Sequence, residues 1–124
     1  MPLAWVVEDN EANFELVEFL LVEAGWRVIR AADRAGFRTL LGGEGPDLVL
    51  LDIHLPDASG LDLLGELRAT PGLERTPVLA LTAHAMRGDR EKFLRAGCDG
   101  YISKPITAST FVAEIEAAIA RRPG

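Results

Sequence analysis

The sequence predicts an α/β fold in which helices cover both faces of a five-stranded parallel sheet. Short apolar runs alternate five times with helical patterns along the 124 residues, and consecutive strand–helix pairs build parallel sheets. The middle runs, VLLD at 49–52 and VLAL at 78–81, are almost continuously apolar, which is typical of strands buried on both faces. Such a doubly wound sheet binds ligands at the carboxyl ends of its strands.

The strands are short β-rich runs separated from the helices by turn-forming residues. In chain order they are expected at Leu3–Val7, 26–32, 47–52, Pro77–Thr82 and 100–103. Each helix is recognised by apolar residues that recur every three or four positions and by a stop signal. The first helix, expected at 10–25, stops at Gly25 and shares one apolar face among Phe14, Val17, Leu21 and Ala24.

The remaining helices differ in length and charge. The second, Arg34–Leu41, is short, has a weaker helical pattern and ends at the sequence GGEGP. The third, at 60–70, is closed by Pro71-Gly72, and the fourth, at 87–97, is highly charged and ends at Gly97. The last precedes the sequence RRPG and carries on one face Phe111, Ile115, Ala118 and Ile119.

Length and composition restrict the classes of function. The length is that of one domain, so a single domain over 1–124 without an output domain is expected. The net charge of −6 argues against nucleic acid and membrane as direct partners. No apolar run approaches the roughly 20 residues that span a bilayer, and the start lacks the basic region of a signal peptide. The single Cys98 rules out an internal disulfide and fits a reducing cytoplasm.

Polar side chains follow four of the predicted strands at the point where each strand ends. In chain order these are Glu8-Asp9, Asp52, Thr82 and Ser103-Lys104-Pro105. Singly, Asp, Asn and Thr here are common helix caps, and Asn10 is expected to be one. Because the carboxyl ends of parallel strands meet at one edge, we expect three carboxylates, a hydroxyl and an ammonium to lie together.

Three neighbouring carboxylates would repel one another unless a cation neutralised them. Mg²⁺ (or Mn²⁺) suits an all-oxygen site of one or two carboxylates, water and a phosphoryl ligand. Together with Lys104 it would balance the three negative charges and leave the site ready for a phosphoryl group. The sequence therefore predicts a magnesium-dependent phosphoryl site at this edge of the sheet.

Four motifs, in order and in register, resemble the response-regulator receiver domain of two-component signalling. They are VVEDN at 6–10, DLVLLDIHLPDASG at 47–60, ALTAHAM at 80–86 and YISKPI at 101–106. The region 81–106 is most similar to single-domain receivers of the bacterial cell-cycle type and to receivers of hybrid kinases. The resemblance spans essentially the whole chain and implies a flavodoxin-like (βα)5 fold with strand order 2-1-3-4-5.

The resemblance implies a role for each residue of the acidic group. Asp52 would be the phosphoacceptor, taking a phosphoryl group from a histidine kinase or a histidine phosphotransferase. Asp9 and Asp52 would coordinate the metal together with the backbone carbonyl of His54, and Glu8 would hold metal-bound water. A downstream signalling protein would then read the phosphorylated state.

The resemblance also implies a switch. Lys104 and Thr82 would contact phosphoryl oxygens, and the ring of Tyr101 would rotate inward when Thr82 moves. The read-out face would be formed by the fourth helix, the fifth strand and the fifth helix. The Lys104-Pro105 peptide bond is expected to be cis.

Two histidines, His54 and His84, flank the predicted site. A transition-metal site is disfavoured because the other ligands are oxygens. We expect the two side chains to tune the lifetime of the phosphorylated state. Ala58 departs from the resemblance, because many receivers carry a large apolar residue there.

A stand-alone response regulator is the expected function, and a receiver domain of a hybrid histidine kinase is the alternative. A haloacid-dehalogenase-like phosphatase would carry a second Asp where this chain has His54. A receiver-fold adaptor that is never phosphorylated would usually lack Asp52 or Lys104. A flavin-binding protein is disfavoured because the EDNEAN sequence after the first strand would repel the cofactor's phosphate.

Overall fold

Five parallel strands form one sheet in the order β2-β1-β3-β4-β5, which confirms the predicted fold class and strand order. The computed structural model describes residues 1–83 and 89–120. Its elements are β1 Leu3–Val7, α1 Glu11–Glu23, β2 Arg27–Ala31, α2 Arg34–Leu41, β3 Leu48–Asp52, α3 Gly60–Arg68, β4 Val78–Thr82, α4 Asp89–Ala96, β5 Gly100–Ser103 and α5 Phe111–Ala120. Among the described residues, no helix has both the length and the apolar character that crossing a membrane requires.

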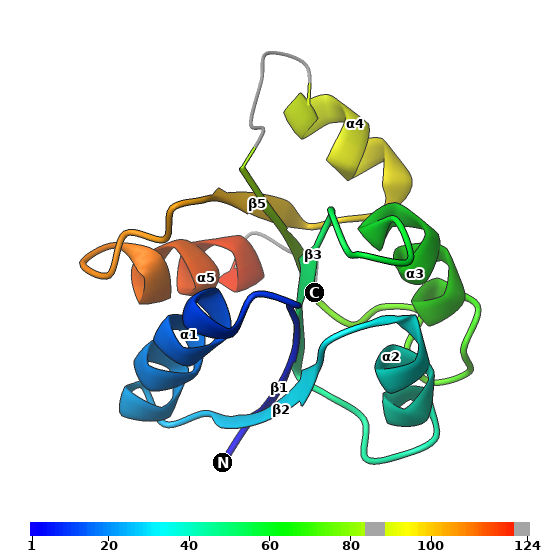
Figure 1. Cartoon of the computed structure of the whole chain (residues 1–124), viewed down its shortest axis with the longest axis horizontal. Coiled ribbons are helices and arrows are strands. Elements are labelled where there is room, and N and C mark those ends of the chain that lie inside the picture. Colours follow the sequence, from blue (N-terminus) through cyan, green and yellow to red (C-terminus); the bar gives the residue numbers. More distant parts are fainter. Residues whose placement is uncertain (84–88, 121–124) are drawn as a thin grey trace.

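Helices α1 and α5 cover one face of the sheet, and α2, α3 and α4 cover the other (Figure 1). The strands supply both cores because successive side chains point to opposite faces. In β1, Leu3, Trp5 and Val7 pack toward α2 and α3, whereas Ala4 and Val6 pack toward α1 and α5. This two-sided burial explains why β1 is apolar throughout and why β3 and β4 are apolar up to their last residue.

One detail of the first helix differs from the prediction. Ala24 was expected on the buried face, but α1 ends at Glu23 and Ala24 is its exposed C-cap. The N–H of Ala24 closes the last turn on the carbonyls of Leu20 and Leu21, and Gly25 then turns the chain with a φ of 94°. A positive φ suits glycine, so the stop signal was correct and the face ends one turn earlier.

The strand register brings the predicted polar residues to one edge of the sheet. Asp52 is paired with Leu81 and Thr82 with Ser103, so the ends of β3, β4 and β5 are level. Val7 is paired with Leu51, which places the residues after β1 beside the end of β3. Because all five strands run in the same direction, every strand–helix loop that follows a strand opens on this edge.

Gly60 allows α3 to start directly behind Asp52. Its N–H donates to the carbonyl of Ile53 at 2.9 Å, so the backbones are in direct contact. A Cβ at this position would lie 2.3 Å from the carbonyl oxygen of Asp52 and 2.9 Å from the Cα of Ile53. Any other residue must therefore displace backbone next to Asp52.

We expect Gly60→Ala to lower the free energy of unfolding by about 2–3 kcal/mol, since overpacking against backbone cannot be relieved by a side-chain rotation. Gly65→Ala is the matched control, because it lies in the same helix with nothing within 4 Å of the added Cβ. The control should gain about 0.5–1 kcal/mol from helix propensity. Urea unfolding followed by circular dichroism measures both values. Equal stabilities for the two variants would contradict the close-approach argument.

Candidate functional site

Three carboxylates converge where β1 and β3 end. One oxygen from each of Glu8, Asp9 and Asp52 lies within 4.8 Å of the other two. The side chains differ in exposure, because Glu8 is 0% and Asp52 2% exposed whereas Asp9 is on the surface. The acidic cluster therefore has a buried floor and an accessible rim.

Lys104 places its ammonium between the two buried carboxylates. The Nζ atom lies 2.9 and 3.1 Å from the two oxygens of Glu8 and 3.1 Å from Oδ2 of Asp52. Lys104 directly follows β5, and its backbone N–H donates to the carbonyl of Thr82 at 2.8 Å. The Lys104-Pro105 bond is cis, as the family resemblance implies.

Backbone N–H groups bind the side chain of Asp52 and that of Asn10, which adjoins the cluster. The N–H of His54 donates to Oδ1 of Asp52 at 2.9 Å, so one carboxylate oxygen is held by the main chain and the other by Lys104. Asn10 caps α1 by accepting from the N–H of Asn13 at 2.9 Å, as predicted.

The two buried carboxyls differ in proton affinity. Burial, reinforced by a hydrogen bond with Asp52, raises the pKa of Glu8 to about 7, and Lys104 opposes the rise. Burial acts on Asp52 in the same sense, but hydrogen bonds from Glu8, the His54 N–H and Lys104 outweigh it and lower the pKa of Asp52. At neutral pH Asp52 is therefore ionised, whereas Glu8 is partly protonated.

The remaining predicted residues lie around this cluster. Thr82 is 1% exposed at the end of β4, and Tyr101 is half-buried on β5. The Tyr101 ring lies 6.1 Å from that of Phe93 in α4, at 59° between planes. His54 is exposed and pairs across the loop with Ser59, whereas His84 lies outside the described residues.

The departure at Ala58 does not leave the loop after β3 unpacked. Ala58 packs partly buried against the core under α2, α3 and α4. Its carbonyl accepts from the N–H of Leu55 at 3.3 Å, which closes the turn. The small side chain therefore packs against the core within a closed turn.

Arg30 is a site residue that the sequence reading did not identify. It lies on β2, and its guanidinium donates to the carbonyls of Glu8 at 3.1 Å and Asp9 at 3.2 Å. The available signal was a charge inside a strand whose neighbours, Val28 and Ile29, are apolar. Nothing in that pattern indicated which loop the side chain would reach.

Residues 4–116 match the family model described as the response regulator receiver domain. The chain belongs to the receiver-domain family. Relatives agree: the polar-differentiation response regulator DivK of Brucella anthropi is 40% identical over 111 residues, which are 90% of each chain.

Solved structures of a response regulator and of another receiver domain have the same fold as this chain. A putative response regulator of Chloroflexus aurantiacus has a TM-score of 0.87 at 28% identity, covering 97% of this chain and 98% of that one. The receiver domain of the sensor histidine kinase PA1611 of Pseudomonas aeruginosa has a TM-score of 0.84 at 33% identity, covering 96% and 98%. That structure has a magnesium ion coordinated in its active-site cleft.

The chemistry of the donors in this receiver domain fits the same kind of ion. Mg²⁺ prefers carboxylate and carbonyl oxygens, and the three converging groups here are all carboxylates. The exposed Asp9 gives access from solvent, while Glu8 and Asp52 lie beneath it. These residues are therefore suited to a hard divalent cation.

The stability of the metal-free protein should fall as pH rises from about 5 to 8. The folded-state pKa of Glu8, about 7, exceeds its ordinary value of 4.5, so the folded state binds the extra proton and loses that stabilisation as pH passes 7. The loss is up to about 3 kcal/mol. Urea unfolding in EDTA should show this slope in wild type and not in Glu8→Gln. A Glu15→Gln control on the exposed face of α1 should retain the slope, and a flat wild-type profile would contradict the assignment.

Proposed function

We propose that this receiver domain accepts a phosphoryl group on Asp52 from a phosphohistidine of a histidine kinase or histidine phosphotransferase. The observation that carries the proposal is the position of the Asp52 carboxylate, buried at the base of an acidic cluster with an ammonium 3.1 Å away. We further propose that residues 1–124 act as one such domain in the cytoplasm. The buried thiol of Cys98 fits a reducing compartment.

In the proposed transfer, an oxygen of Asp52 attacks phosphorus in line, and the phosphorus–nitrogen bond to the donor imidazole breaks. The protein contributes mainly position and charge neutralisation to such a reaction. The low pKa of Asp52 keeps the nucleophile ionised, and the His54 N–H fixes its orientation. Lys104 would then contact a phosphoryl oxygen as a compact positive charge.

A magnesium ion would be held by Asp9, Asp52 and the backbone carbonyl of His54, with Glu8 acting through water. The bound ion supplies positive charge that offsets both the carboxylates and the phosphoryl oxygens. The convergence of the three carboxylates supports this assignment, as does the magnesium of the Pseudomonas receiver. Mn²⁺ has the same ligand preference and would serve in its place.

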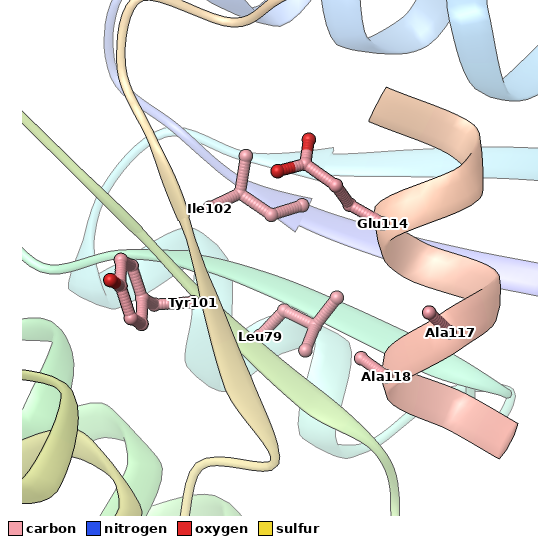
Figure 2. A pocket seen from close by; sticks show the side chains of 6 residues that line it. All are labelled: Leu79, Tyr101, Ile102, Glu114, Ala117 and Ala118. Carbon is pink, nitrogen blue, oxygen red and sulfur yellow. The ribbon is translucent and has the colours of Figure 1, made fainter. Parts of the chain in front are cut away.

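Thr82 and Tyr101 would form the switch. The Thr82 hydroxyl would hydrogen-bond a phosphoryl oxygen, and the Tyr101 ring would move from its place beside Phe93 into the vacated space. The proposed read-out face is α4, β5 and α5. A pocket of about 210 Å³ between β5 and α5 supports this choice (Figure 2); it is lined by Leu79, Tyr101, Ile102, Glu114, Ala117 and Ala118.

Free-standing action, with the signal passed to a downstream protein by contact, is supported by the 40% identity to DivK. A place in a hybrid kinase is the second candidate, because the Pseudomonas receiver is named as part of a sensor histidine kinase. Family membership does not support the phosphatase alternative. An adaptor that is never phosphorylated is disfavoured because Asp52 and Lys104 are both present and in contact.

Acetyl phosphate with Mg²⁺ should add one phosphoryl mass to the wild-type protein and none to Asp52→Asn. The amide cannot act as the nucleophile that the carboxylate provides. Intact-protein mass spectrometry measures the adduct. Asp57→Asn, which removes an exposed carboxylate from the loop after β3, should be labelled like wild type. Equal labelling of Asp52→Asn would place the phosphoacceptor elsewhere.

Thr82→Ala should still accept the phosphoryl group at Asp52 but should lose much of the switch. A hydrogen bond to a charged acceptor contributes about 1.5–3 kcal/mol, whereas a shift from 1:99 to 99:1 needs about 5.5 kcal/mol. Lys104 and Tyr101 must supply the rest, so uncoupling should be partial.

Amide NMR shifts on α4, β5 and α5, recorded with and without beryllofluoride, measure the coupling. Shifts of wild-type size in Thr82→Ala would remove Thr82 from the mechanism. An absence of shifts on this face in wild type would place the read-out surface elsewhere, for example on α1.

A further inference from the structure

Arg30 connects the edge strand β2 to the turn that carries two carboxylates of the acidic cluster. Its Nε donates to the carbonyl of Glu8 at 3.1 Å, and its Nη2 donates to the carbonyl of Asp9 at 3.2 Å. Both acceptors are main-chain atoms of consecutive residues. The planar fork of a guanidinium can bond two such oxygens at once, which a single ammonium on a flexible chain does less well.

The turn that Arg30 contacts directs two consecutive side chains toward the same point. Consecutive residues of a strand point to opposite faces, yet Glu8 and Asp9 both direct a carboxylate toward Asp52. They do so because β1 ends at Val7, and the last strand-like contact is from the N–H of Glu8 to the carbonyl of Ala31 at 2.9 Å. The direction of both side chains is therefore set by the turn and its main-chain partners.

Arg30 is itself held in place. Its Nη1 donates to a carboxylate oxygen of Glu11 in the first turn of α1 at 2.7 Å. The guanidinium carbon lies 4.7 Å from the centre of the Phe14 ring, a cation–π distance, and the side chain is only 24% exposed. The guanidinium thus contacts the turn on one side and α1 on the other.

We propose that Arg30 is a positioning residue for the cation site. Through the carbonyls of Glu8 and Asp9 it sets the direction of their carboxylates and so raises the affinity of the site for Mg²⁺. This inference rests on the proposed function, because the cation is the one that the receiver site is proposed to bind. Groups that orient metal ligands from behind typically contribute 10–100-fold to metal affinity.

The sign of the effect separates this role from a simple charge effect. Arg30 is a cation close to an acidic site, so removal of its charge alone would make the site more negative and strengthen Mg²⁺ binding. Loss of the fork would leave the turn without two of its hydrogen bonds and weaken Mg²⁺ binding. The two contributions therefore predict opposite shifts of the same dissociation constant.

The test measures Mg²⁺ affinity by titration calorimetry on the full chain, without a phosphodonor. Arg30→Ala should bind Mg²⁺ at least about tenfold more weakly than wild type. Arg30→Lys keeps the charge and most of the stem over Phe14 and should still bind several-fold more weakly, because it lacks the fork. Arg27→Ala is the matched control, since it removes the same charge from the same strand at an exposed ion pair with Glu44.

Thermal melting in EDTA and the amide NMR spectrum establish that each variant is folded, and changes at residues 8–10 report the turn. If Arg30→Ala fails to fold, Arg30→Lys decides the matter. Wild-type or tighter Mg²⁺ binding in folded Arg30→Ala, or full recovery in Arg30→Lys, would overturn the role of the fork. If wild type itself binds no Mg²⁺, the proposed function fails and this inference fails with it.

Discussion

The contact on which the site depends is the ammonium of Lys104 between the buried carboxylates of Glu8 and Asp52. Two carboxylates held this close would repel, and an isolated buried charge is strongly disfavoured. The ammonium offsets part of that negative charge. Glu8, whose pKa is raised to about 7, offsets a further part because it is partly protonated near neutral pH. The two carboxylates can thus stay close together, and a bound cation or phosphoryl group would change the net charge around them.

The sheet makes this contact possible. Lys104 is 96 residues from Glu8 and 52 from Asp52 in sequence, yet the parallel register brings all three to one edge. The buried strands β1 and β3 keep Glu8 and Asp52 away from water, which by itself would raise the pKa of both carboxyls. Hydrogen bonds then lower the pKa of Asp52 alone, so the two values diverge. Packing of the core therefore prepares the electrostatics of the site, and Gly60 keeps α3 close without displacing Asp52.

The alternation of strands and helices, and the two-sided core, could be predicted from the sequence because both depend on local apolar periodicity. The edge of the sheet that carries the site could also be predicted, since parallel strands all end on one side. Asp52, Glu8, Asp9 and Lys104 could be grouped from that rule alone. The end of α1 was misplaced by one residue at Ala24, because helix ends depend on the cap as well as on the apolar face.

The sequence by itself determined the fold class and the acidic group, because both follow from residue type and spacing. The expected partners came instead from the resemblance of its four motifs to receiver domains. Only the tertiary structure decided which contacts the residues of this group make and how those contacts shift their pKa values. It places Lys104 against Glu8 as well as Asp52, and it gives Glu8 rather than Asp52 the raised pKa. It also directs Arg30 to the turn after β1. These features depend on distances between residues far apart in the chain and on burial from water, and neither quantity is encoded in any local stretch of sequence.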